Sequence, residues 1–359
     1  MKTIYFTLIT LMLSSHCFSQ EDIKTSPFSV NGYLETYYVY DFSNPENNSR
    51  PGFVYSHNRH NEVTVNLGFI RGTYNTDNVR ANLALMAGTY TNANLAAEPG
   101  VLKNIFEGNV GVKISSGKNL WIDAGIFSSH IGFESAIGKD CWTLTRSILA
   151  DNTPYYEAGA KISYTSDNGK WFFSGLALNG WQRIQRVDGN SLPSFGTQIT
   201  FKPNSSITLN SSTFIGTDKP DSARLMRYFH NFYGIFQISE KIGLILGFDY
   251  GVEEKTPEDN STNKWMSPVM IAKFTMTDKV AFAVRAEYYD DEDSVIIATG
   301  TPNGFKTTGV SANIDYQILP NAVWRLEVKN YTSKDEIFSG EDEVSKNNAA
   351  IATALAISF

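Results

Sequence analysis

The stretch Ala322–Tyr331 reads AVWRLEVKNY, and its side chains alternate in character with a period of two. The apolar members fall on one face of an extended chain and the charged members on the other: Trp324, Leu326 and Val328 against Arg325, Glu327 and Lys329. A helix would mix these two sets because it turns every 3.6 residues, whereas a β-strand separates them completely. The stretch therefore predicts a strand with one apolar and one charged face.

The same alternation runs along the chain from Phe28 to Phe359. Val280–Tyr289 and Phe106–Ser115 repeat the pattern, and the last strand, Ile351–Phe359, places small alanines on one face and larger apolar residues on the other. Strands of about 10 to 13 residues match a tilted membrane crossing, whereas strands of globular proteins average about half that length. The length of the strands therefore favours a barrel in a membrane over a soluble β-sandwich, although the alternation alone fits both.

The connections between the strands are of two kinds. Seven are tight turns rich in Asn, Asp, Gly, Ser and Pro, at residues 75–78, 116–119, 167–170, 203–205, 239–241, 277–279 and 320–321. Such residues are typical of hairpin turns. Eight longer polar segments alternate with the turns, at approximately residues 43–59, 92–104, 130–154, 183–193, 217–224, 254–263, 292–304 and 334–347.

These connections predict an all-β fold, a transmembrane antiparallel up-and-down β-barrel of about sixteen strands. An even number of strands, short periplasmic turns and long external loops are typical of bacterial outer-membrane barrels. Aromatic residues at the strand ends are expected to form two interfacial girdles. The outer girdle would contain Tyr37, Tyr38, Tyr40, Tyr90, Trp181, Trp265, Tyr288 and Tyr331, and the inner girdle Trp121, Tyr164, Trp171, Trp324 and Phe359.

The first nineteen residues have the pattern of a cleaved signal peptide. Lys2 is followed by the apolar run Ile4–Leu13 and a polar exit that ends at Ser19. A lipoprotein signal at Cys17 is a weaker interpretation, since His16 occupies a position that requires a small residue. We expect residues 1–19 to be removed and residues 20–359 to form one barrel domain in the outer membrane of a Gram-negative cell.

The composition of the mature chain excludes several classes of function. Removal of Lys2 would shift the formal charge from −7 to −8, and this acidic balance argues against nucleic acid as a partner. Cys141 would be the only remaining cysteine, so neither an internal disulfide nor a paired-cysteine metal site can form. His57 and His60 lie together in the first long loop, but no further ligands accompany them. We expect no cofactor and no metal.

Three short segments resemble the OmpL-like family of β-barrel porins. They are Val30–Tyr38 (VNGYLETYY), Ile131–Glu134 (IGFE) and Pro154–Gly159 (PYYEAG), and the likeness extends over essentially the whole mature chain. The resemblance implies an outer-membrane pore for small solutes, without implying which solutes. Trimers are common among sixteen-stranded porins, so a homo-oligomer is expected by analogy alone.

The longest loop, at residues 130–154, is the candidate constriction of this pore. By likeness to porins in which the third loop narrows the lumen, the candidate constriction residues are Glu134, Lys139, Asp140, Arg146 and Asp151. Charges in a narrow passage act on an ion at short range, where bulk salt screens them incompletely. An ordinary solvated surface loop is the alternative, although Trp142, Leu144, Ile148 and Leu149 favour a loop that packs against something.

Counting the strand phase gives the charged residues expected to face the lumen. The acids are Glu35, Glu62, Glu107, Asp123, Glu157, Asp249, Glu287, Asp315 and Glu327, and the bases are Arg80, Lys113, Lys161, Lys202, Arg227, Lys273, Arg285, Arg325 and Lys329. Nine acids against nine bases predict weak charge selectivity. Many of these groups are also expected to pair across strands.

Passive diffusion of small hydrophilic solutes or ions through a water-filled lumen is the function that the sequence favours. A closed structural or adhesive barrel, which binds a surface partner through its external loops, is the alternative. Enzymatic activity is not expected, because the chain lacks the G-x-S-x-G, H-E-x-x-H and phosphate-loop motifs. The expected partners are thus outer-membrane lipid and small hydrophilic solutes or ions.

Overall fold

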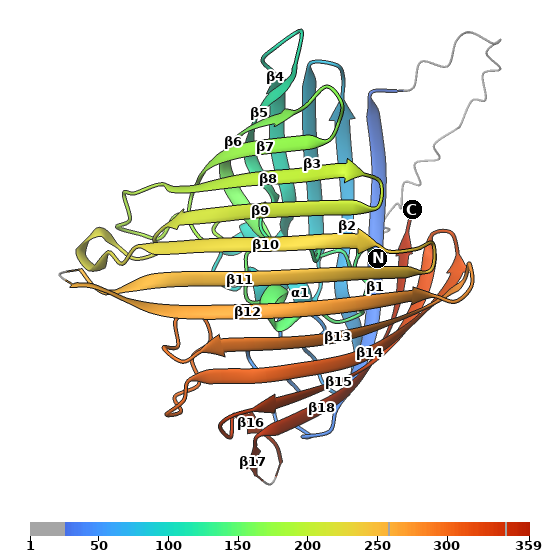
Figure 1. The fold of residues 1–359 in the computed structure, drawn as a ribbon, viewed down its shortest axis with the longest axis vertical. Coiled ribbons are helices and arrows are strands. Elements are labelled where there is room, and N and C mark those ends of the chain that lie inside the picture. Colours follow the sequence, from blue (N-terminus) through green and yellow to red (C-terminus); the bar gives the residue numbers. More distant parts are fainter. Residues whose placement is uncertain (1–25, 258, 342) are drawn as a thin grey trace, which may run out of the picture.

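The computed structural model describes residues 26–257, 259–341 and 343–359, so the expected signal peptide lies outside the described residues. Sixteen antiparallel strands close into one barrel (Figure 1). The barrel strands are β1 (Phe28–Asp41), β2 (Val63–Asn75), β3 (Val79–Ala87), β4 (Ile105–Lys113), β5 (Asn119–Ser128), β6 (Tyr156–Thr165), β7 (Trp171–Leu178), β8 (Ser194–Asn204), β9 (Ile207–Gly216), β10 (Arg227–Gln237), β11 (Ile242–Thr256), β12 (Asp259–Thr275), β13 (Val280–Asp291), β14 (Phe305–Leu319), β15 (Ala322–Ser333) and β18 (Asn347–Ser358). The predicted all-β, sixteen-stranded barrel is therefore confirmed.

The first and last strands pair with each other and close the barrel. The register of β1 with β18 runs from Tyr33 opposite Ser358 to Asp41 opposite Ala350, and β15 pairs with the other side of β18. Closure removes the unpaired edges that an open sheet would expose. The start of β1 and the C-terminal residue Phe359 consequently lie at the side of the tight turns, where the backbone of Gly32 bonds to that of Phe359.

The alternation in Ala322–Tyr331 separates the two faces of β15 as expected. Arg325 and Glu327 are each 1% exposed and point inward, whereas Trp324 and Val328 are on the outer surface, 37% and 49% exposed. The same division holds in β13, where Arg285 is buried and its neighbours in sequence face outward. In β13 and β15, alternation in the sequence therefore identifies the side chains that face the lumen.

Two details of the predicted layout are wrong. The expected long loop at 254–263 is mostly strand, because β11 continues to Thr256 and β12 begins at Asp259. The outer aromatic girdle is the second error: Tyr37, Trp265 and Tyr331 are 2%, 1% and 2% exposed and pack inside the barrel. Trp121 of the expected inner girdle also points inward, over Arg80.

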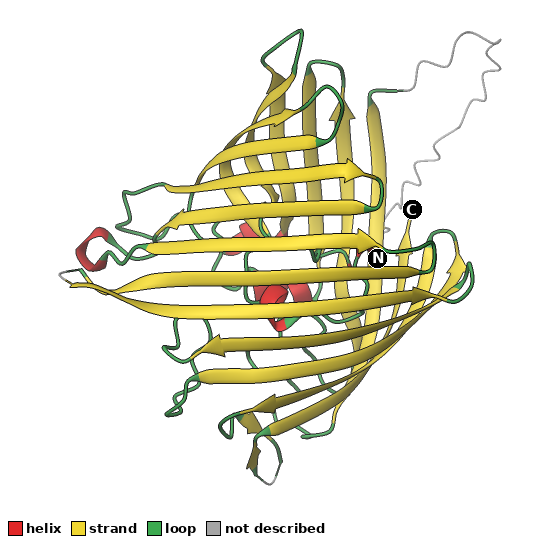
Figure 2. Ribbon diagram, in the orientation of Figure 1, coloured by secondary structure: helices red, strands yellow, loops and turns green. Residues whose placement is uncertain are grey.

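Short helices and one small hairpin occupy the loops. They are α1 (Thr89–Asn94), α2 (Ile148–Asp151), the 3₁₀ turns η1 (Gly100–Asn104), η2 (Gly138–Asp140) and η3 (Asp221–Ala223), and the pair β16 (Phe338–Ser339) and β17 (Val344–Ser345). In Figure 2 the central helices are seen within the outline of the barrel, whereas η3 lies at an outer tip. Among the described residues, none of the helices is long and apolar enough to cross a membrane.

Candidate functional site

The connection between β5 and β6, residues 129–155 and here named loop 3, folds into the barrel. Its base is fastened to the wall at His130. The Nδ1 atom of His130 lies 2.9 Å from both carboxylate oxygens of Glu157, and Nε2 lies 2.8 Å from the carbonyl oxygen of Thr213. The hydroxyl of Ser212 donates to the carbonyl of His130 at 2.7 Å. Loop 3 therefore begins with a buried polar anchor.

The geometry at His130 indicates a protonated ring. A carbonyl oxygen can only accept, so the nitrogen facing Thr213 must carry hydrogen, and the nitrogen facing the Glu157 carboxylate is also best satisfied as a donor. Burial by itself lowers the pKa of His130, but the Glu157 carboxylate and the carbonyl of Thr213 outweigh burial and raise that pKa above 6.5. An imidazolium paired with a carboxylate thus holds the base of loop 3.

The tip of loop 3 is bound by side chains of the opposite wall. Strands β13, β14 and β15 supply these groups, which reach the loop backbone across more than 130 residues of sequence. The contacts are Ile148 N to Glu287 at 2.6 Å, Thr145 N to Glu327 at 2.6 Å, Leu144 N to Asn313 at 3.0 Å, Arg325 to the carbonyls of Gly138 and Cys141 at 2.7 and 2.9 Å, and Lys329 to the carbonyl of Arg146 at 2.9 Å. Wall side chains therefore satisfy these peptide groups of the loop inside the barrel.

Arg285 of β13 is at the centre of this contact. Its guanidinium donates to Thr143 and Thr145 of loop 3 at 2.8–2.9 Å and to the Glu327 carboxylate at 2.8 Å. Two more carboxylates, Glu134 of the loop and Glu287 of the wall, lie 3.7 and 3.5 Å away. Lys329 also pairs with Glu287, at 2.8 Å. These five charged groups, here named the docking cluster, are Glu134, Arg285, Glu287, Glu327 and Lys329.

Of the predicted constriction residues, two are engaged in holding the loop together. Arg146 is 1% exposed and donates to the carbonyls of Leu144, Ser135 and Ala136 at 2.7, 2.8 and 3.3 Å. Glu134 accepts from the backbone and the hydroxyl of Ser147, which caps α2. Both side chains are buried between the loop and the wall.

The other three candidates border cavities on either side of loop 3. Lys139 and Asp140 are exposed, pair with each other at 2.7 Å and line an inner cavity of about 410 Å³. Asp151 lines an outer cavity of about 350 Å³ together with Arg183 and Arg227. Burial raises the pKa of Asp151 to about 6. Loop 3 thus separates an inner from an outer vestibule, each with charged walls.

Most predicted lumen charges are neutralised by a partner. Arg80 pairs with Asp123 at 2.5 Å, Arg325 with Asp315 at 2.7 Å, and Arg227 with Glu253 at 2.6 Å. Glu107 pairs with Arg71 at 3.2 Å. Among the other predicted groups, Glu35 lies 3.4 Å from His57, Asp249 accepts from Asn231, and Glu62 pairs with Arg59 just before β2. Two lysines lie over aromatic rings, Lys161 over Phe127 and Lys273 over Trp142. Lys113 and Lys202 lie at inner strand ends.

Arg71 and Glu253 were missing from the predicted set, although both face the lumen. The pairing of β1 with β2 shifts at a β-bulge between Glu35 and Thr36. Because of this shift, alternation counted from Glu62 places Arg71 on the outer face, although its side chain faces the lumen. Glu253 lies near the end of β11, in a segment that was expected to be loop. An alternation counted separately on each side of the bulge would have found Arg71.

The architecture defines the class of this protein. A closed sixteen-stranded antiparallel barrel has an apolar outer surface, a polar inner wall and a loop folded across its interior, which is the arrangement of porins. No cluster of three or more His, Cys, Asp or Glu side chains among the described residues is placed to hold a metal ion.

The family model described as "Putative beta-barrel porin-2, OmpL-like" matches residues 27–359, and the chain belongs to this family. It is therefore a porin of the outer membrane. No curated protein sequence matches it significantly.

Several solved structures share the fold at low sequence identity. The anion-selective porin from Comamonas acidovorans superposes with a TM-score of 0.61 at 8% identity, over 92% of this chain and 99% of that one. OmpT of Vibrio cholerae gives 0.60 at 10% identity, with 94% and 100% covered. OmpF of Salmonella typhi, in complex with daunomycin, gives 0.58 at 10% identity, with 92% and 97% covered. At these identities the similarity describes the fold.

Proposed function

We propose that small hydrophilic solutes or ions diffuse passively between loop 3 and the wall formed by β2–β6. The observation that supports this path is the uneven polar docking of loop 3. Its tip makes most of its hydrogen bonds with β13–β15, whereas Lys139 N makes one to the Tyr33 hydroxyl of β1. On the opposite wall, side chains keep access to solvent: Arg71 is 21%, Arg80 32% and Glu107 15% exposed. A passage lined by paired charges of both signs would select only weakly between anions and cations.

Lys139, Asp140 and Asp151 are the constriction candidates that such a path would meet. They border the vestibules at the two faces of loop 3. In this proposal Glu134 and Arg146 act indirectly, because they fix the shape of the loop. The barrel acts as a channel and performs no catalysis.

Cysteine labelling tests the path. Burial raises the pKa of the native Cys141 thiol to about 11, so this thiol should be inert at neutral pH. We expect Arg80→Cys and Lys161→Cys to react with a charged methanethiosulfonate and to lose single-channel current. Ser267→Cys is the matched control, since Ser267 is also lumenal but fully buried. Current loss at Ser267 but not at Arg80 or Lys161 would contradict the proposed path.

We further propose that the protein assembles as a trimer through the outer face of β2–β4. One solved neighbour, OmpT of Vibrio cholerae, is itself described in a trimer form. In this chain an apolar groove of about 810 Å³ lies on the outer surface, lined by Phe28, Ile70, Leu83 and Val110 around small residues such as Gly108. Gly108→Trp should fill the groove and shift the protein to monomers in native electrophoresis. Leu246→Trp on the outer face of β11 is the control.

A further inference from the structure

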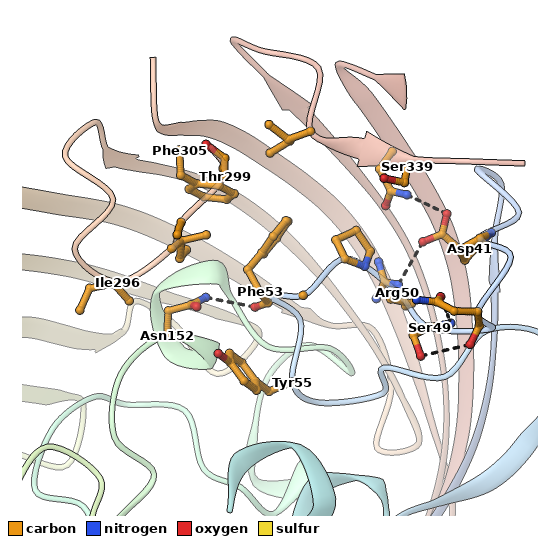
Figure 3. Close-up of a pocket in the computed structure, with 18 residues that line it drawn as sticks. Asp41, Ser49, Arg50, Phe53, Tyr55, Asn152, Ile296, Thr299, Phe305 and Ser339 are labelled. Atoms are coloured by element: carbon orange, nitrogen blue, oxygen red, sulfur yellow. Dashed lines mark hydrogen bonds and ion pairs between the residues drawn. The ribbon is translucent and has the colours of Figure 1, made fainter. Parts of the chain in front are cut away.

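A separate cavity lies among the external loops, beside loop 3 and outside the proposed path. Figure 3 shows it between loop 1 (residues 42–62), loop 7 (residues 292–304) and loop 8 (residues 334–341 and 343–346), with Asn152 of loop 3 at one side. Its volume is about 440 Å³, within the range of about 300–1,000 Å³ that small-molecule sites occupy. Passive conduction does not require such a cavity.

One wall of this cavity carries buried polar atoms that lack partners. Asp41 and Arg50 are 0% and 4% exposed and pair at 3.5 Å, and the amide of Asn348 donates to Asp41 at 2.7 Å. Within the described part of the chain, Nη2 of Arg50 and Oδ1 of Asn348 nevertheless make no hydrogen bond. An unsatisfied buried polar atom costs about 1–3 kcal/mol. A polar ligand that reaches these donors and acceptors would recover that cost.

The facing wall is apolar and in part aromatic, and its lining residues are Ile296, Ile297 and Ala298 of loop 7 together with Phe53 and Phe305. Phe53 lies in the middle of the pocket in Figure 3, and its ring centroid is 4.8 Å from that of Phe305 and 5.3 Å from that of Tyr331. Tyr55 borders the same cavity. The faces of aromatic rings carry negative partial charge and attract polarised C–H groups. A ligand that fits both walls must therefore present hydroxyl groups on its edge and C–H groups on its face.

The charge of the lining defines the ligand further. Among the described residues that line the cavity, Asp41 and Arg50 are the only charged ones, and they neutralise each other. The other polar lining groups are amides and hydroxyls, from Asn47, Ser49, Tyr55, Asn152, Thr299, Ser339 and Asn348. An anion or a cation would meet no uncompensated charge here. From this combination we propose that the cavity is a binding site for neutral saccharides at the external mouth of the pore.

Maltose and sucrose are suitable neutral probes, and L-proline is a zwitterionic comparison. With the full chain in detergent we would measure binding by isothermal titration. We expect saturable binding of at least one sugar. The titration does not depend on conduction, so it separates failure of this inference from failure of the proposed path.

Two variants test the location of the site. Arg50→Met should weaken binding about tenfold to a hundredfold, as expected when one charged hydrogen-bond donor is lost. Because Arg50→Met leaves Asp41 without its partner, Ser339→Trp provides an independent test that fills the cavity from an exposed position of β16. Ser222→Trp, on the exposed turn η3 away from the cavity, should bind like the wild type.

Three outcomes are decisive. Binding that Arg50→Met and Ser339→Trp remove and Ser222→Trp preserves supports the site. A folded, conducting wild type that binds neither sugar overturns the inference and leaves the porin function intact. Binding of L-proline alone overturns the assignment to neutral saccharides.

Discussion

Arg285 is the residue whose replacement should release loop 3 from the wall. Arg285→Met would remove the hydrogen bonds to Thr143, Thr145 and Glu327. Three carboxylates, from Glu134, Glu287 and Glu327, would then share one remaining cation of the docking cluster, Lys329. The docked loop should become less stable relative to an undocked loop.

The size of this effect follows from the burial of the cluster. Side chains of Arg285, Glu287 and Glu327 are each 0% exposed. Breaking a buried ion pair by removing one partner costs about 3–5 kcal/mol, and each 1.4 kcal/mol is about tenfold in an equilibrium constant. The ratio of docked to undocked loop should consequently fall by about a hundredfold to a few thousandfold. The barrel itself should survive, because its backbone ladder does not depend on Arg285.

Single-channel recording measures the consequence. We expect Arg285→Met to show larger mean conductance and more open-channel noise than the wild type, with an unchanged shift between heated and unheated bands in electrophoresis as proof of a folded barrel. The double variant Arg285→Met, Glu327→Gln restores the charge balance and keeps an acceptor for the backbone of Thr145. It should recover part of the wild-type behaviour. Conductance and noise identical to wild type in a folded Arg285→Met barrel would refute the reasoning.

Three further predictions concern charge and pH. Protonated His130 holds the base of loop 3, and its pKa is raised above 6.5 in the folded protein. This stabilisation is therefore complete below the pKa of an unfolded histidine and is lost as the pH rises through the pKa of the folded protein. Open-channel noise should increase with pH in the wild type, and His130→Gln should be noisy and insensitive to pH. Asp151 has a pKa raised to about 6, so it loses charge below pH 6; reversal potentials in a salt gradient should shift towards anions between pH 7 and pH 5, and Asp151→Asn should remove this shift. Lys139→Gln should move the reversal potential slightly towards cations, since the side chains of Lys139 and Asp140 are exposed and salt screens charges in contact with solvent. A large shift would place Lys139 in a narrow, desolvated passage.

The strands were readable from the sequence because a lipid-facing row and a lumen-facing row alternate with the pleat. This is why the ends of β15 and β13 agree with the predicted segments within a few residues. The failure at 254–263 has a physical cause. There the ends of β11 and β12 carry Glu253, Glu254 and Lys264, so polar residues occur on both faces and the alternation disappears, although the ladder continues through Glu253 opposite Asn263.

The aromatic girdle was misplaced because it was predicted from positions at strand ends, without the direction in which each side chain points. Tyr331 lies at an outer strand end, as expected for a girdle, but it has the same odd phase as Arg325 and Glu327 and therefore points inward. Trp265 likewise shares its phase with Lys273 in β12. The position of a residue along a strand does not determine whether its side chain points outward or inward. Only a residue that lies near a strand end and also points outward can contact the membrane interface. The docking of loop 3 could not be read in this way, because it depends on contacts between residues more than a hundred positions apart.

The balance of lumen charges has a different meaning once the docking cluster is known. In an open aqueous wall, equal numbers of acids and bases would describe selectivity, because each group would face the solute through water. Here Arg285, Glu287 and Glu327 are removed from water by loop 3, and an unpaired charge in such a place is strongly unfavourable. Balance among these groups is therefore a requirement of docking, and it says little about the ions that pass. Selectivity should instead follow the few charges that retain solvent, among them Lys139, Asp140 and the partly exposed Arg80, so substitutions at these residues should shift the reversal potential, whereas substitutions in the docking cluster should change conductance.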